Sequence, residues 1–221
     1  MAEGDGALPT RAERRQQATS DTRASILEAA RATLLAVGSA NLSTRAVAEA
    51  AEVPLSQIHY HFGSKQQLIL AVLAAENDRL LVRQRQMFAG DEPLWRQWER
   101  ACDYLDDDLD SGYVRVLQEM IAAGWSDADV AAAVRRYMTG WYDLLRNVAA
   151  RTADRLGGLG PFSPAEVSAL MGVPFMGTES MILLGFTEGD LPARSALRKI
   201  GRLIRTFEEG AVPTARQEEA P

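Results

Sequence analysis

Residues 43–65 read STRAVAEAAEVPLSQIHYHFGSK, and no other part of the chain is as informative about fold and function. Ser43 and Thr44 are candidate N-cap residues for a short helix with an apolar stripe. A sharp turn at residues 52–54 follows, and Ile58 and Phe62 then occupy the inner side of a second short segment. Two short helices joined by a tight turn are typical of a helix-turn-helix.

The outer side of the second segment is rich in hydrogen-bonding and aromatic groups. These side chains are Ser56, Gln57, His59, Tyr60 and His61. A recognition helix must be short enough to enter the major groove of DNA, and its outer side chains must contact base edges and phosphates. The pattern therefore predicts a DNA-reading helix.

This stretch resembles the DNA-binding domain of the TetR (tetracycline-repressor-like) family of bacterial transcriptional regulators. The family pattern is an Ala-rich helix, a tight turn, a helix that ends in a Tyr/His/Phe cluster, and Ser-Lys before a long helix. The matching residues are 50–53, 58–62 and 64–65, and the resemblance extends without gaps from about Thr22 to Leu70. Further along the chain it rests on helix order and length.

Two residues depart from the family pattern. Glu52 stands where the family usually has Gly, so we expect a non-Gly residue in the left-handed conformation, at a cost of roughly 1–2 kcal/mol. His59 stands where the family usually has a Tyr that contacts a phosphate, so we expect that contact to differ in length or charge.

The predicted DNA contacts divide by side-chain chemistry. Gln57 offers a paired donor and acceptor suited to adenine, whereas Lys65, Tyr60 and Thr44 are expected to contact the phosphate backbone. The full predicted set is Thr44, Arg45, Leu55, Ser56, Gln57, His59, Tyr60, His61 and Lys65.

Composition and charge agree with a helical DNA-binding protein. Hydrophobic residues make up 47% of the 221, enough for a sizeable core, and the abundance of Ala, Leu, Arg and Glu favours an all-α fold. The net charge of −6 is adverse for DNA binding, but residues 11–65 contain seven basic and five acidic side chains. The acidic excess therefore lies downstream, where no DNA contact is needed.

Cysteine usage and hydropathy indicate the compartment. Cys102 is the single cysteine, which excludes an intramolecular disulfide; it is expected to be a small buried residue, with a redox switch as the alternative. The N-terminal residues lack the basic start and apolar run of a secretory signal. The longest apolar stretch, 68–75, is far shorter than the ~20 residues of a membrane span. We therefore expect a cytoplasmic protein without a membrane segment.

Apolar periodicity and capping signals predict the remaining helices. They are expected at residues 22–37, 65–87, 94–110, 112–123, 126–156, 164–185 and 192–209, and the third of them ends in the acidic run 106–110. Ser126 and Ser163 are the expected caps of the helices 126–156 and 164–185. Pro174 is expected to kink or interrupt the helix 164–185. The predicted domains are a flexible basic-containing tail (1–20), a three-helix helix-turn-helix DNA-binding domain (21–66), a helical ligand-binding and dimerisation domain (67–210) and a flexible tail (211–221). The basic cluster of the first tail either solubilises the protein or grips DNA.

The motifs of catalysis and metal binding are missing from the sequence. It contains no phosphate-binding Gly loop, no nucleophile elbow and no Cys/His metal spacing, so no enzyme, no cofactor and no metal are predicted. The acidic run 106–108 is expected to be a solvated surface rather than a cation site.

Large side chains in the C-terminal part suggest an apolar cavity for a small molecule. Each favours the core individually, but together they could line a pocket with few polar anchors, for which Glu119, Glu179 and Arg135 are candidates. The predicted lining is Trp98, Tyr137, Trp141 and Phe175.

The predicted function is a ligand-responsive, sequence-specific DNA-binding transcriptional regulator, most simply a repressor released from a palindromic operator by a small molecule. The resemblance implies double-stranded DNA, a small-molecule effector and a second copy of the chain as partners, with dimerisation through the last two long helices. The alternative is a helical protein–protein adaptor that does not bind DNA, in which the basic positions are ordinary surface.

Overall fold

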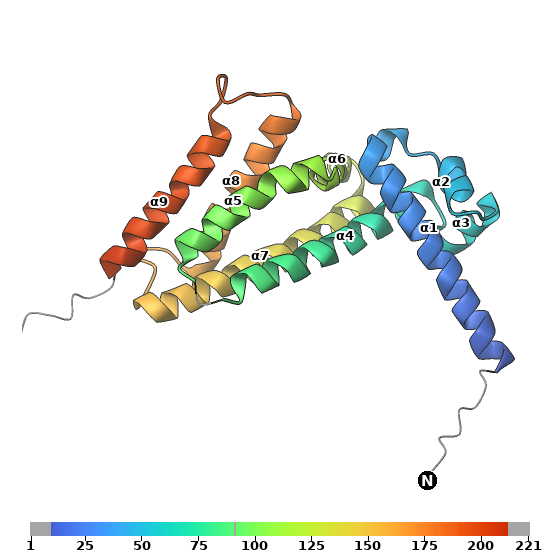
Figure 1. Cartoon of the computed structure of the whole chain (residues 1–221), viewed down its shortest axis with the longest axis horizontal. Coiled ribbons are helices and arrows are strands. Elements are labelled where there is room, and N and C mark those ends of the chain that lie inside the picture. The colour runs from blue at the N-terminus through green and yellow to red at the C-terminus, as the bar shows by residue number, and fades with distance from the viewer. Residues whose placement is uncertain (1–9, 91, 212–221) are drawn as a thin grey trace, which may run out of the picture. The chain divides into compact units, whose positions relative to one another are not determined.

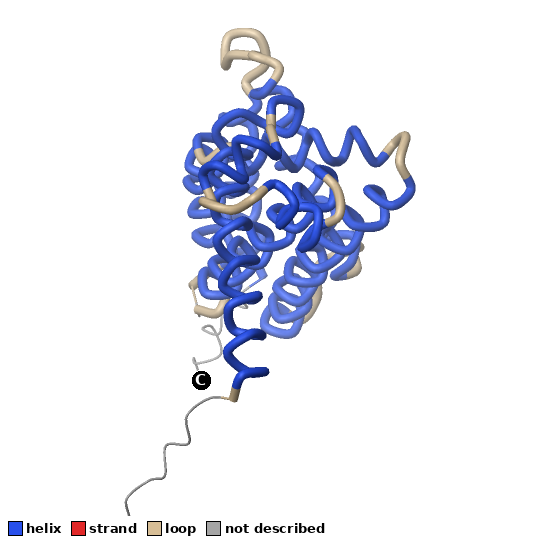
Figure 2. Tube along the Cα trace, turned by 90° about the vertical axis from the view of Figure 1, so that its right-hand side faces the viewer, coloured by secondary structure: helices blue, strands red, loops and turns tan. Residues whose placement is uncertain are grey.

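The computed structural model describes residues 10–90 and 92–211, so the predicted tail segments 1–9 and 212–221 lie outside the described residues. The described part is helical and contains no strand (Figure 2). Its helices are α1 (Arg11–Asn41), α2 (Thr44–Ala50), α3 (Leu55–Phe62), α4 (Lys65–Phe88), α5 (Leu94–Asp110), α6 (Tyr113–Gly124), α7 (Ala128–Leu156), α8 (Pro164–Leu183) and α9 (Ala193–Ala211).

The chain forms two compact units that divide between Ala74 and Ala75. The first contains α1 to α3 and the beginning of α4, and the second contains the rest of α4 and α5 to α9 (Figure 1). Helix α4 therefore contributes residues to both.

In the first unit, each helix contributes at least one buried apolar side chain to the core. Ile26 and Leu34 of α1, Val47 of α2, Ile58 of α3 and Leu68 of α4 are at most 1% exposed. Burial of branched apolar side chains of this size contributes about 1.5–3 kcal/mol each. This core sets α2 and α3 against α1, as the predicted helix-turn-helix requires.

Helix α1 begins eleven residues earlier than predicted, so residues 11–20 are not a flexible tail. Thr10 and Glu13 form a capping box: the Glu13 amide donates to Thr10 Oγ1 at 3.3 Å, and the Thr10 amide donates to Glu13 Oε2 at 2.6 Å. All side chains of residues 11–20 are exposed. The capping box and the helix propensity of its residues stabilise the helical segment 11–20. Because the segment is exposed on all sides, it has no apolar periodicity from which a helix could be predicted.

The turn between α2 and α3 confirms the expectation for Glu52. Its φ is 55°, the one positive value among the described residues other than glycine. The amide of Glu52 donates to the Glu49 carbonyl at 3.1 Å, and that of Val53 donates to the Ala48 carbonyl at 3.0 Å. These hydrogen bonds offset the strain of the left-handed conformation.

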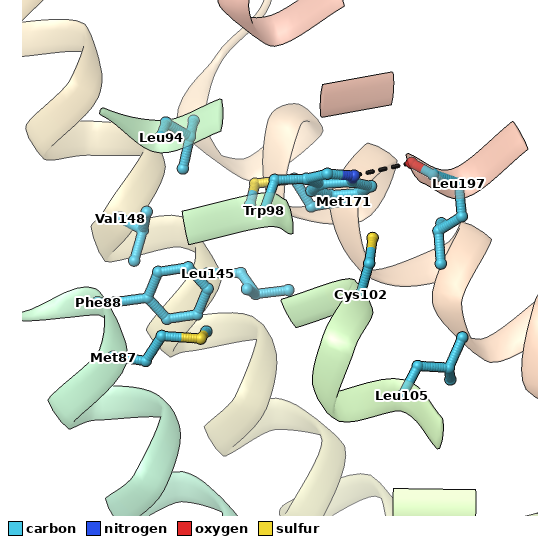
Figure 3. Close-up of a cluster of buried hydrophobic side chains, with 10 residues drawn as sticks. All are labelled: Met87, Phe88, Leu94, Trp98, Cys102, Leu105, Leu145, Val148, Met171 and Leu197. Carbon is cyan, nitrogen blue, oxygen red and sulfur yellow. Dashed lines mark hydrogen bonds between the residues drawn. The ribbon is translucent and has the colours of Figure 1, made fainter. Parts of the chain in front are cut away.

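In the second unit, α4, α5, α7, α8 and α9 meet around Trp98 (Figure 3). The Trp98 side chain is 1% exposed, and its indole Nε1 donates to the Leu197 carbonyl of α9 at 2.8 Å. Cys102 lies in the same cluster and is buried as predicted. Burial raises the pKa of its thiol to about 11.

Helices α7 and α8 approach closely at a glycine. A Cβ on Gly172 would lie only 2.5 Å from Cε1 of Tyr142 and 3.0 Å from Cζ3 of Trp141. Any larger residue must displace these rings, so Gly172 fixes the distance between the two helices.

The predicted helix caps are correct at one site and wrong at another. Ser163 forms the predicted capping box with Glu166, whereas α7 is capped by Asp127 and not by Ser126. The Asp127 carboxylate accepts from the amides of Asp129 and Val130 at 2.9 and 3.0 Å, and a charged acceptor suits the positive end of a helix. Helix α8 continues through Pro174, so the alternative of an interruption there is wrong.

The acidic run at the end of α5 is only partly solvated, contrary to prediction. Asp108 is half-buried, and both its carboxylate oxygens lie 2.6 Å from Nη2 of Arg83. Asp106 pairs with Arg194 at 2.9 Å. The prediction failed because the partners, Arg83 and Arg194, lie far from this run in the sequence, and the local pattern does not indicate them.

Glu208 of α9 caps the start of α5. Its side chain is 8% exposed, and its oxygens accept from the amides of Leu94 and Trp95, each at 3.0 Å. Arg155 of α7 donates to the same carboxylate at 2.7 Å. The N-cap residue Pro93 offers no side-chain acceptor, so Glu208 supplies from another helix what the local sequence lacks.

We expect Glu208→Ala to lower the free energy of unfolding by about 2–4 kcal/mol, because it leaves two helix-end amides and Arg155 without their acceptor. The neighbouring exposed Glu209→Ala is the control and should cost less than about 1 kcal/mol. Urea denaturation measures both, and equal losses would contradict the proposed cap.

Candidate DNA-binding site and ligand cavity

Contacts with α1 fix the positions of α2 and α3. Ser43 caps α2 by accepting from the Ala46 amide at 3.4 Å, and the Ser25 hydroxyl of α1 donates to the Ala51 carbonyl at 3.4 Å. The Arg23 guanidinium of α1 lies 5.1 Å from the ring centroid of Phe62. Because Ile58 and Phe62 are buried, the opposite side of α3 faces outward.

The outward side of α3 carries several of the predicted contact residues. Ser56, His59 and Tyr60 are exposed, Tyr60 by 74%. Leu55, Gln57 and His61 are half-buried. The Nδ1 atom of His59 lies 3.2 Å from the Gly63 carbonyl oxygen, so this ring is oriented by the end of its own helix.

The remaining predicted DNA contacts flank α3. Arg45 is exposed near the start of α2, and Thr44 is half-buried at its first position. Lys65 begins α4, and its ammonium donates to the Ala40 carbonyl at 3.2 Å. An ammonium has three donors, so this bond leaves two for a phosphate.

The basic cluster near the N-terminus, for which the sequence left a solubilising and a DNA-gripping role open, forms part of a basic surface on α1. Arg11, Arg15 and Arg23 line an open groove together with Tyr60 of α3. Helical spacing of four residues places Arg11 and Arg15 on one side of α1, a relation that a flexible tail would not have. The capping box of Thr10 and Glu13 is the local sequence feature that marks the start of this helix.

The second unit contains a narrow cavity of about 70 Å³. Three of the four predicted lining residues, Trp98, Trp141 and Phe175, line it, whereas Tyr137 is not among its lining residues. The rings of Trp98 and Phe175 meet edge to face, with centroids 5.1 Å apart. The indole Nε1 of Trp141 donates to Gln84 Oε1 at 2.8 Å.

Six side chains with a hydroxyl, amide or carboxyl group also line the cavity. They are Asn77, Gln84, Tyr104, Asp108, Tyr113 and Glu179. Of the three anchors proposed from sequence, only Glu179 lies there; Glu119 and Arg135 do not line the cavity. Asn77 and Gln84 were missed because polar residues within a long helix normally face solvent.

Glu179 is held in a nearly apolar setting. Its Oε2 atom lies 3.4 Å from Nε2 of Gln118, which also donates to the Met176 carbonyl at 3.3 Å. Burial raises the pKa of the Glu179 carboxyl to about 7, with the Gln118 hydrogen bond acting in the opposite direction. Burial likewise raises the pKa of Asp108, against the effect of the Arg83 guanidinium.

Among the described residues, no group of three or more His, Cys, Asp or Glu side chains could bind a metal ion. Within the same part of the chain, no helix has both the length and the hydropathy to cross a membrane.

Comparison with known proteins identifies the first unit. Residues 26–72 match the family model described as bacterial regulatory proteins, tetR family. A search of curated proteins gives no match. The description of the matching family agrees with the DNA-binding regulator that the sequence predicts.

Solved structures share the fold over most of the chain. A TetR transcription regulator from Haloarcula marismortui is 18% identical, with a TM-score of 0.67 over 86% of this chain and 98% of that one. A protein described as a transcriptional regulator from Saccharomonospora viridis, solved in complex with choline, is 19% identical, with a TM-score of 0.68 over 86% and 96%. The reduced form of Escherichia coli NemR is 18% identical, with a TM-score of 0.62 over 81% and 96%.

The agreement covers both units. Residues 26–72 of the helix-turn-helix unit match the tetR-family model, and the chain has the fold of solved TetR-family transcriptional regulators.

Proposed function

We propose that the protein is a homodimeric transcriptional repressor that leaves a palindromic operator when a small molecule binds in the second unit. The observation that carries the proposal is the outward side of α3, with exposed Ser56, His59 and Tyr60 above a buried core. We assign residues 21–66 to DNA binding and 67–210 to ligand binding and dimerisation.

The basic side chains around α3 support DNA as the partner. Arg45 and Lys65 flank the helix, and Arg11, Arg15 and Arg23 line the groove beside Tyr60. The adaptor alternative gives these charges no common partner. Binding of duplex DNA that weakens steeply as salt rises would distinguish the two functions, because phosphate contacts release counterions.

Gln57→Ala is expected to relax preference at one base position, since a paired amide contact to adenine contributes about 1–3 kcal/mol of discrimination. Lys65→Ala is expected to weaken all sequences alike and to reduce the salt slope by about one unit. The operator is first selected from genomic fragments, and single-base variants are then compared by fluorescence anisotropy. Identical profiles for the two variants would refute the assignment of roles.

Exposed apolar side chains support dimerisation through α8 and α9. Leu170 and Val173 of α8 are 55% and 61% exposed, and Leu203 and Phe207 of α9 are 71% and 43% exposed. Spacings of three and four residues place each pair on one side of its helix. Large apolar side chains gathered on a surface favour association. The two helix-turn-helix units of a dimer would contact two half-sites whose centres lie one helical turn of DNA, or a whole number of turns, apart.

Leu203→Glu and Val173→Glu should each convert the dimer to a monomer and abolish high-affinity operator binding, because a carboxylate cannot be buried there without a partner. Val82→Glu, at a position on α4 that is 51% exposed, is the control and should leave the dimer intact. Sedimentation velocity measures the mass of each variant. Dimers that persist in both α8 and α9 variants would exclude this interface.

The cavity supports an effector site. Aromatic and Met side chains surround a few polar groups, as in small-molecule sites, and one relative of the same fold was solved with choline bound. Helix α4 supplies Lys65 near the DNA-reading residues and Gln84 and Met87 at the cavity. A ligand that prefers one position of α4 would change the spacing of the two recognition helices. A coupling of ~1–3 kcal/mol lowers operator affinity about 5–150-fold.

A compound screen by tryptophan quenching should find ligands that bind the free dimer more tightly than the operator-bound dimer, as linkage requires of an inducer. Trp141→Phe should reduce the quenching, since Trp141 lines the cavity. Trp125→Phe is the control, because Trp125 is 82% exposed and is not a lining residue. Equal affinity for the free and operator-bound forms would rule out an induction site.

A further inference from the structure

We propose that the cavity of the second unit selects an organic cation, whose positive group lies beside the Glu179 carboxylate and whose apolar groups lie among the aromatic side chains. This inference rests on the proposed function, because it names the chemical class of the effector. It depends on the charge balance of the cavity, on its rings and on its adaptable methionines.

The two carboxylates of the cavity differ in their partners. Asp108 is neutralised by Arg83, with two contacts of 2.6 Å. In the described part of the chain, Glu179 has no ion-pair partner: its side-chain contact is the uncharged Gln118 amide at 3.4 Å. When it is ionised, Glu179 therefore carries a negative charge that no ion pair among the described residues balances, and a cation would balance it.

The walls favour a cation as well. Trp98, Tyr104, Trp141 and Phe175 line the cavity, and the faces of such rings attract positive charge. One wall already shows this interaction within the protein, since the Arg83 guanidinium lies 4.5 Å from the centroid of the Tyr104 ring. An anionic ligand would meet Glu179 and the same negative ring faces, and it would be repelled.

The size of the cavity sets a further condition. About 70 Å³ is well below the ~300–1,000 Å³ of a typical ligand pocket, so an organic cation must displace side chains as it enters. Met138, Met171 and Met176 line the cavity, and their unbranched side chains rearrange readily. The displacement gives the ligand a means of changing the packing of α7 and α8, to which these residues belong.

Cation binding should depend on pH, because the buried Glu179 carboxyl gains or loses a proton near neutral pH. The titratable groups that interact electrostatically with Glu179 are Asp108, which is paired with Arg83, Tyr113 of α6 and Tyr142 of α7. Burial raises the pKa of Glu179 to about 7, so the empty site is partly protonated at neutral pH. A cation binds the ionised form, so its affinity should rise as pH increases through about 7 and fall by about tenfold per unit below it.

The test compares cations with a neutral isostere. Choline, benzyltrimethylammonium and tetraphenylphosphonium are titrated into the intact dimer by calorimetry, beside 3,3-dimethylbutan-1-ol, the uncharged analogue of choline. At least one cation should bind tenfold or more tightly than the alcohol, and more tightly at pH 8 than at pH 6. Glu179→Gln should lose tenfold or more of that affinity and most of its pH dependence. Glu99→Gln, at an exposed position of α5, should change neither.

Operator binding, measured in parallel, separates the two proposals. Cation binding that depends on Glu179 but leaves operator affinity unchanged would support the cation site and refute the inducer function. Release from the operator by a neutral or anionic compound alone would support the inducer function and overturn the cation site. Circular dichroism checks that the Glu179→Gln dimer is folded. If this folded variant and the wild type bind the cation with equal affinity, the cation-site proposal is also overturned.

Discussion

The packing of five helices around Trp98 is the constraint on which the second unit depends. The indole is buried and bonded to the Leu197 carbonyl of α9, so its orientation is fixed by α5 and α9 together. The same ring forms part of the cavity wall, as do Met87 and Met171 of the core cluster. The cavity is therefore an unfilled part of the core and not a separate groove. Whatever enters it must alter contacts that stabilise the fold.

The sequence predicted those features that arise from short-range patterns. The buried side of α3, the left-handed Glu52 and the Ser163 capping box depend on residues within a few positions of one another, and the structure agrees. The DNA contacts of Gln57 and Lys65 stay predictions, although both residues lie beside the exposed surface of α3.

The features that the sequence did not predict arise from partners far apart in the chain. Asp108 was assigned to a solvated surface because nothing near it indicates Arg83, 25 positions away. Glu208 caps a helix that begins 114 positions earlier, and no local pattern reports such a contact. Tyr137 was assigned to the cavity as one of the large side chains of the C-terminal part, and the size of a side chain does not identify its neighbours in space.

The burial of Cys102 restricts how the protein can respond to its surroundings. Burial raises the pKa of this thiol to about 11, so it is almost entirely protonated at neutral pH, and the thiolate is the reactive form. Oxidants and electrophiles therefore have little access to the sole sulfhydryl of the chain. The same burial disfavours any regulation of this chain through the Cys102 thiol.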